Sequence, residues 1–169
     1  MKTELSRTSR NRGSSLIEAV IAMGVLAVAI PLVFGAIAES GQSGMSAEAE
    51  TRSSWIIPAC MDEIQASREG KPLYFTATTS GQAFPEFGSI WALGFSSDGK
   101  PVGKIEKAVY DKGAKEISGK PIRYIATLSA VAQVPATTPP MMRVLITLEY
   151  PSTAPAAKRQ KLDFYTRIP

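Results

Sequence analysis

Glu18 is the residue whose chemistry most constrains this sequence, because it is the only charged side chain between Leu16 and Ala38. A hydrocarbon core about 30 Å thick requires roughly 20 apolar residues of helix, so this stretch is long enough to span a bilayer. A charge near lipid costs on the order of a few kcal/mol unless it is paired or held at the interface. Glu18 therefore requires a partner.

One partner for Glu18 lies in its own helix. Ser15 and Glu18 have the spacing of a capping box, in which the two side chains satisfy each other's free backbone N–H groups at the helix start. This motif does not account for Gly13 or for the basic residues that precede it.

The segment Gly13-Ser14-Ser15-Leu16-Ile17-Glu18, between a basic leader and an apolar helix, resembles the prepilin peptidase site of type IV pilins and type II secretion pseudopilins. The resemblance implies cleavage after Gly13 on the cytoplasmic side and methylation of the new N-terminus at Ser14. The family usually has Phe or Met where this chain has Ser14, and its helix-kinking proline lies farther from the cleavage site than Pro31 does. The whole chain also resembles the B member of the Verru_Chthon cassette family, whose pilin-like proteins carry the same N-terminal signature.

The resemblance implies a non-enzymatic subunit, of the minor class, in a type IV pilus-like or type II secretion pseudopilus-like filament. After cleavage the helix would leave the bilayer and pack in a helical bundle. Glu18 would then compensate the positive N-terminus of a neighbouring Ser14, since a close opposite charge favours the ionised carboxylate. Pro31 would provide a place for the helix to bend. The implied partners are prepilin peptidase, other pilin or pseudopilin subunits and membrane lipid.

The formal net charge of +4 is concentrated before the apolar stretch. The first 13 residues contain one acidic residue and four basic ones, which leaves +1 for the rest: Glu4 against Lys2, Arg7, Arg10 and Arg12. A basic segment directly before a spanning helix marks the cytoplasmic flank. We expect a single-pass inner-membrane protein with an extracytoplasmic C-terminal domain, either in the membrane or assembled into a periplasmic or surface filament. We expect no nucleic-acid partner for the mature domain.

A secretory signal is the alternative to pilin-type processing. Residues 1–38 contain a charged region, an apolar region and Ala36-Ile37-Ala38 as a small-residue cleavage site. The apolar run is longer than the usual 7–15 residues or so of a signal peptide, and it contains Glu18 near its start. In this alternative the chain is an exported or membrane-anchored periplasmic binding module that uses residues 1–38 as a signal or anchor, and aromatic residues such as Trp91 line its ligand surface.

Residue types that serve catalysis or metal binding are sparse. The chain contains no histidine, which excludes His-based triads and leaves no plausible zinc site. We therefore expect no enzyme, catalytic residue, cofactor or metal. Cys60 is the single cysteine and is expected to be a small buried hydrophobe. The carboxylates of Asp62 and Glu63 are expected on a solvated helix face.

The sequence divides into three regions: a prepilin leader over 1–13, a hydrophobic transmembrane and assembly helix over 14–38, and an extracytoplasmic pilin-like globular domain over 39–169. Residues 45–67 predict an amphipathic helix whose apolar face includes Trp55, Met61 and Ile64. Pro58 predicts a kink or restart near residue 57. Gly70, followed by a proline, predicts the C-cap.

Strand patterns follow this helix. We expect strands at 73–76, 90–95, 102–105 (or on to 109–110), 122–128, 143–150 and 161–167, with a hairpin turn at Asp98-Gly99. Residues 104–120 are expected to form a solvated loop and strand edge. The fold class is thus α+β and pilin-like, with a long N-terminal helix packed on a small antiparallel β-sheet. Its first half would span the membrane, and its amphipathic second half would cover the sheet.

Overall fold

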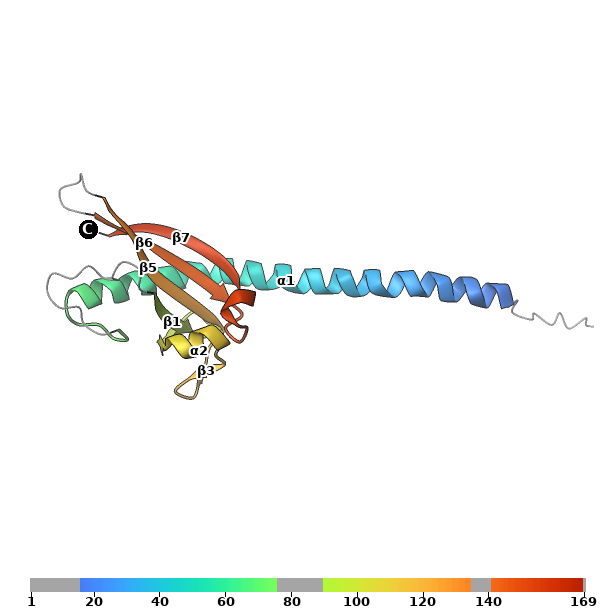
Figure 1. Cartoon of the computed structure of the whole chain (residues 1–169), viewed down its shortest axis with the longest axis horizontal. Coiled ribbons are helices and arrows are strands. Elements are labelled where there is room, and N and C mark those ends of the chain that lie inside the picture. Colours follow the sequence, from blue (N-terminus) through green and yellow to red (C-terminus); the bar gives the residue numbers. More distant parts are fainter. Residues whose placement is uncertain (1–15, 76–89, 135–140, 169) are drawn as a thin grey trace, which may run out of the picture. The chain divides into compact units, whose positions relative to one another are not determined.

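The computed structural model describes residues 16–75, 90–134 and 141–168, and it has an α+β architecture, as predicted (Figure 1). Helix α1 runs from Leu16 to Arg68. The chain forms two compact units, Met1–Gly44 and Met45–Pro169. The first contributes the N-terminal part of α1, and the second contains the rest of α1 together with the sheet.

The sheet of the second unit has five antiparallel strands in the order β2-β1-β5-β6-β7. These strands are β1 (Trp91–Phe95), β2 (Pro101–Ile105), β5 (Tyr124–Val134), β6 (Met141–Tyr150) and β7 (Gln160–Ile168). Smaller elements connect them: helix α2 (Lys107–Lys112), the β3–β4 pair (Glu116–Ile117 and Lys120–Pro121) and the 3₁₀ helix η1 (Ala156–Lys158).

Alternation along the strands builds the inner face of the sheet, as the sequence predicts. Val144, Ile146, Leu148 and Tyr150 of β6 are all buried in one core cluster. Their register partners on β5 include Leu128 opposite Ile146, and partly buried side chains of β7 pack on the same cluster. The predicted pairing of 122–128 with 143–150 and the predicted strand over 161–167 are therefore confirmed.

The second half of α1 covers this inner face. Ile56, Cys60 and Ile64 are fully buried, so the prediction of a buried Cys60 is confirmed. The prediction for Trp55 was wrong, because its side chain is 68% exposed. Successive side chains of a helix point about 100° apart around its axis. Because Ile56 points at the sheet, the preceding residue, Trp55, points toward solvent.

The helix continues unbroken through Pro58, so the predicted restart does not occur. A proline inside a helix costs about 3 kcal/mol, which is comparable with what a fully buried side chain such as Ile56 or Ile64 contributes. Packing against the sheet therefore offsets the local cost. The predicted C-cap is confirmed: Gly70 has φ +76°, its N–H donates to Ser67, and the N–H of Lys71 donates to Ala66.

Residues 73–75 do not form the predicted strand, and position 76 lies outside the described residues. The N–H groups of Leu73, Tyr74 and Phe75 instead donate to the carboxylate of Glu63, at 3.2, 2.8 and 3.0 Å. Glu63 is only 3% exposed, so placing it on a solvated helix face was also wrong. The carboxylate provides the acceptors that a neighbouring strand would otherwise supply, while Asp62 is exposed as expected.

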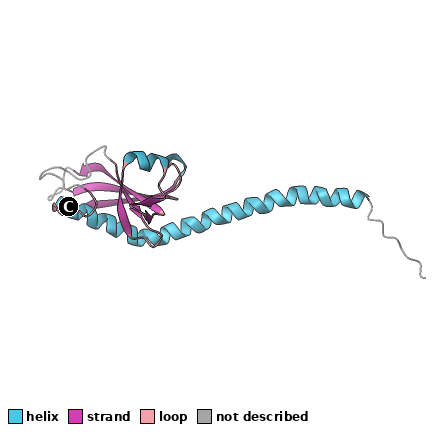
Figure 2. Cartoon of the chain, turned by 90° about the horizontal axis from the view of Figure 1, so that it is seen from below, coloured by secondary structure: helices cyan, strands magenta, loops and turns pink. Residues whose placement is uncertain are grey.

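A second, smaller core lies on the outer face of the sheet, which places the sheet between α1 and α2 (Figure 2). Ile105, Ile122 and Ile125 are buried there. The predicted solvated loop over 104–120 was thus wrong in part, since residues 109–110 belong to α2 and Ile117 packs on β1. A Cβ on Gly94 would lie 2.4 Å from Ile117 Cδ1, so a larger residue here would force the Ile117 side chain to move.

The Asp98-Gly99 hairpin is confirmed between β1 and β2. Gly99 has φ +80°, a conformation that favours glycine, and the N–H of Ser96 donates to the carbonyl of Lys100 at 3.0 Å. The Ser96 hydroxyl also donates to the carboxylate of Asp98. This hydrogen bond and the contact with Lys100 lower the pKa of Asp98 to about 2.

The helix–sheet contact predicts that substitutions on two neighbouring faces of α1 change the free energy of unfolding by very different amounts. Ile64→Ala should lower the free energy of unfolding of the second unit by about 2–5 kcal/mol, because it leaves a cavity in a closed core. Trp55→Ala, the matched control, should change it by about 0.5 kcal/mol or less. Urea unfolding of the full chain in detergent micelles, followed by circular dichroism, measures both. Equal losses would contradict this assignment of the buried face.

Candidate functional site

The first unit exposes the most unusual surface of the chain. In α1 between Leu16 and Ile37, 13 large apolar side chains are exposed, among them Phe34 at 68%. The most apolar 18-residue window of α1 has a mean hydropathy of 2.6 and no buried residue. By length and composition this helix can cross a membrane, which is the part of the predicted localisation that the structure supports.

Glu18 lies in the first turn of α1 and is exposed. A negative charge is favoured at this position by the N-terminal end of the helix dipole. Gly13 and Ser14, the predicted processing residues, lie outside the described residues, as does Ser15 of the predicted capping box.

The predicted bend site, Pro31, lies within the helix and is exposed. The helical assignment continues on both sides of it. Gly24 and Gly35, which flank this proline, have no atom within 4 Å of the position that a Cβ would occupy, apart from the helix backbone. Small residues of this kind leave room for another helix to approach closely.

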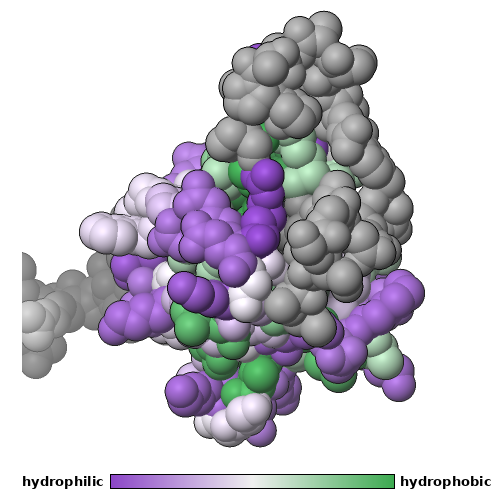
Figure 3. Space-filling model, turned by 90° about the vertical axis from the view of Figure 1, so that its left-hand side faces the viewer, coloured by the Kyte–Doolittle hydropathy of each residue, from purple (hydrophilic) through white to green (hydrophobic). Residues whose placement is uncertain are grey.

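The second unit has a different surface. Figure 3 shows one face of it, on which the described surface is mainly hydrophilic and the apolar areas are small and separate. Single exposed apolar residues such as Trp55 are ordinary on a soluble domain. The continuous apolar surface thus belongs to the first unit.

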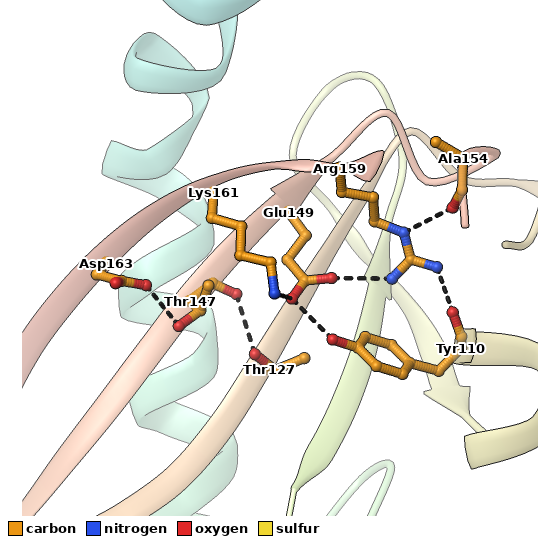
Figure 4. Close-up of polar contacts among 8 residues, drawn as sticks. All are labelled: Tyr110, Thr127, Thr147, Glu149, Ala154, Arg159, Lys161 and Asp163. Atoms are coloured by element: carbon orange, nitrogen blue, oxygen red, sulfur yellow. Dashed lines mark hydrogen bonds and ion pairs between the residues drawn. The ribbon is translucent and has the colours of Figure 1, made fainter. Parts of the chain in front are cut away.

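The second unit also contains a buried ionic cluster on the outer face of the sheet (Figure 4). Glu149 of β6 accepts from Arg159 Nη1 at 2.9 Å, from Lys161 Nζ at 3.1 Å and from the hydroxyl of Tyr110 at 2.7 Å. The side chains of Glu149 and Arg159 are 2% and 0% exposed. A buried charge of either sign requires such pairing.

Arg159 connects this cluster to helix α2 and to the loop before η1. Its guanidinium donates to the carbonyl oxygens of Ala154 and Tyr110, and it lies 4.7 Å from the centre of the Tyr110 ring. Burial, followed by the hydrogen bond to Glu149, raises the pKa of Tyr110 above its usual range. The cluster therefore fastens α2 and η1 to the sheet, and its principal polar groups are engaged with one another rather than directed at a ligand.

The described residues contain no group of three or more His, Cys, Asp or Glu side chains arranged to hold a metal ion. Burial raises the pKa of the Cys60 thiol, and the nearby carboxylate of Glu63 raises it further, so Cys60 is unsuited to nucleophilic chemistry.

Sequence reasoning missed the cluster of Glu149, Arg159 and Tyr110 and the role of Glu63. The only available signal for the cluster was a charge within the apolar strand pattern around Glu149. Its partners lie 10 and 39 residues away along the chain, so only the fold brings them together.

No family model, curated protein or solved structure matches this chain. Its function is therefore inferred from the exposed apolar segment of α1 and from Glu18 within it.

The ionic cluster predicts that the stability of the second unit depends strongly on Glu149. Glu149→Ala should lower the free energy of unfolding of the second unit by about 3–5 kcal/mol, because it leaves the buried guanidinium of Arg159 without its carboxylate. The matched control is Glu106→Ala, whose exposed pair with Lys104 at 3.6 Å should contribute about 1 kcal/mol or less. Urea unfolding measures both variants. A loss for Glu149→Ala no larger than that of the control would show that the cluster does not fasten α2.

Proposed function

We propose that this chain is a pilin-like, non-enzymatic subunit, of the minor class, in a type IV pilus-like or type II secretion pseudopilus-like filament. The observation that carries the proposal is the exposed apolar segment of α1 with a single carboxylate, Glu18, in its first turn. The second unit adds a helix packed on an antiparallel sheet, an arrangement compatible with a pilin-like domain.

The exposed segment requires cover from outside the chain. Burying one large apolar side chain contributes about 1.5–3 kcal/mol, so leaving 13 of them in water costs on the order of 20 kcal/mol or more. This exceeds the few kcal/mol that one charge costs near lipid. Either a bilayer or a bundle of similar helices must therefore cover the segment.

The position of Glu18 favours a function in which the apolar segment lies first in a bilayer and later in a bundle of helices. In the membrane it lies at the end of the apolar run, where the carboxylate can reach the interface. In a helix bundle it would be removed from water, and the cost would be offset only by a positive partner. In the proposed filament that partner is the N-terminal amine of Ser14 in a neighbouring subunit, exposed when prepilin peptidase cleaves after Gly13.

Processing is the first test of this function. With a prepilin peptidase present, intact-mass analysis of the membrane-extracted protein should give a mature chain that begins at Ser14. Gly13→Val should leave the chain uncleaved, because the peptidase recognises the small residue before the cut. A mature N-terminus at Glu39 would instead establish the secretory-signal alternative, and an uncleaved wild type would make residues 1–38 a permanent anchor.

Assembly is the second test. Glu18→Ala should leave membrane insertion and cleavage intact but abolish incorporation into filaments, since an uncompensated buried charge costs about 3–5 kcal/mol. Glu18→Gln should fail equally, because an amide restores hydrogen bonding without restoring the charge. The measurement is the ratio of processed protein in sheared filaments, or in crosslinked pseudopilus complexes, to processed protein left in the inner membrane.

Glu39→Ala is the matched control for assembly, since it removes an exposed carboxylate of α1 outside the apolar run. It should incorporate at the wild-type level. Wild-type incorporation of Glu18→Ala would reduce Glu18 to a helix cap, whose loss costs about 0.5–2 kcal/mol of local helix stability.

A further inference from the structure

The polar contacts on the outer face of the β6–β7 pair stop halfway along the strands. Lys161 and Asp163, near the start of β7, are each held by a polar side chain of β6. At the other end Arg143 and Arg167 lie directly opposite each other in the register. Within the described chain neither guanidinium has a hydrogen bond or an ion pair. Like charges opposite each other destabilise a strand pair. A bound anion would therefore stabilise this end of the sheet.

A cleft of about 460 Å³ lies beside these two arginines. It is lined by Arg143, Tyr165, Thr166 and Arg167. The Tyr165 side chain is 66% exposed. Guanidinium groups bind carboxylates through paired hydrogen bonds, and a tyrosine adds apolar contact area with a hydroxyl at its tip. The cleft therefore suits carboxylate side chains.

The same strand forms an open edge of the sheet. β7 is the last strand in the order, and among the described residues no strand or backbone group pairs with its second edge. It is nine residues long, contains no proline and pairs with β6 without a bulge. Natural sheets usually protect edges of this kind, because their free N–H and C=O groups accept a further strand.

The opposite edge is protected. β2 has five residues, begins at Pro101, and its pairing with β1 is interrupted by a register shift at Gly94. Ile117 of β3 also packs against it, with its Cγ2 atom 3.1 Å from the position of a Cβ on Gly103. The contrast between the two edges indicates that β7 is open for a reason.

The inner face of β7 indicates what would pair with it. Leu162 and Phe164 pack against the main core but remain partly exposed. A strand added beside β7 would complete their burial if it presented apolar side chains on that face. On the other face its side chains would lie beside Tyr165 and Arg167, where carboxylates are favoured. Because side chains alternate along a strand, one segment can meet both requirements.

We propose that the free edge of β7 binds an extended acidic segment of a partner protein, which adds a sixth strand to the sheet. The segment alternates apolar with polar residues and places carboxylates beside Tyr165 and Arg167. A second copy of β7 is disfavoured, because the outer face of this strand carries two basic residues, Lys161 and Arg167, and only one acidic residue, Asp163. This interaction does not depend on the filament function proposed above.

The test uses the full chain in detergent micelles and a fluorescent, capped peptide of about ten residues that alternates valine with threonine. One version carries two glutamates in place of threonines near one end, and the other carries two lysines there. Fluorescence anisotropy should give tighter binding of the glutamate peptide. Hydrogen exchange should then slow by at least about tenfold at those amides of residues 160–168 that do not donate to β6.

Arg167→Glu should weaken binding of the glutamate peptide about tenfold and strengthen binding of the lysine peptide, since it reverses one cross-strand charge pair. Stronger binding of the lysine peptide would also show that the variant is folded. Lys120→Glu, an exposed residue of the separate β3–β4 pair, makes the same change in charge and should leave both affinities unaltered.

The proposal would be overturned if neither peptide bound, or if both bound equally to the wild type and to Arg167→Glu. Two further results would also overturn it. In one, binding occurs without new protection of residues 160–168. In the other, these amides are protected without peptide, in a manner that depends on protein concentration, which would make a second copy of the chain the occupant.

Discussion

The inner face of the sheet and the second half of α1 depend on each other. The helix buries Ile56, Cys60 and Ile64, and without the sheet these side chains would lie in water on a helix that also contains Pro58. The sheet in turn needs the helix to shield Ile146 and the neighbouring core side chains from water. This contact stabilises the helix beyond its local propensity. It also selects which face of the helix is buried, and thereby leaves Trp55 exposed.

Buried polar groups hold the segments that connect the helix and the sheet. On the helix side, Glu63 turns inward and holds the chain where it leaves α1. On the outer face, Glu149 and Arg159 fasten α2 and the loop before β7. Both carboxylates are buried, and both are satisfied by donors from other elements. Because an unpaired buried charge is so costly, such groups specify where the connecting segments lie.

The two units meet different requirements with a single helix. The part of α1 before Glu39 presents apolar side chains in every direction and can be stable only in lipid or among other helices. The part from Met45 onward has one buried face and a solvated remainder. A carboxylate at Glu18 is tolerated by a bilayer only near its interface, whereas in a bundle it requires a cation. The proposed filament subunit would meet these constraints by exchanging one apolar environment for another.

The sequence by itself determined the features that depend on local pattern: the apolar helix, the Gly70 cap, the Asp98-Gly99 turn and the alternating strands of the last third. Each is set by the spacing of a few neighbouring residues or by a glycine whose φ is positive. Only the tertiary structure decided the fate of Glu63, Glu149 and residues 104–120, because a polar side chain is buried or exposed according to partners distant in sequence. The sequence offered several acidic residues that look alike, and folding supplied donors to two of them while leaving Asp62 in solvent. The unmatched Arg143 and Arg167 became apparent for the same reason, since only the register of β6 and β7 places them opposite each other.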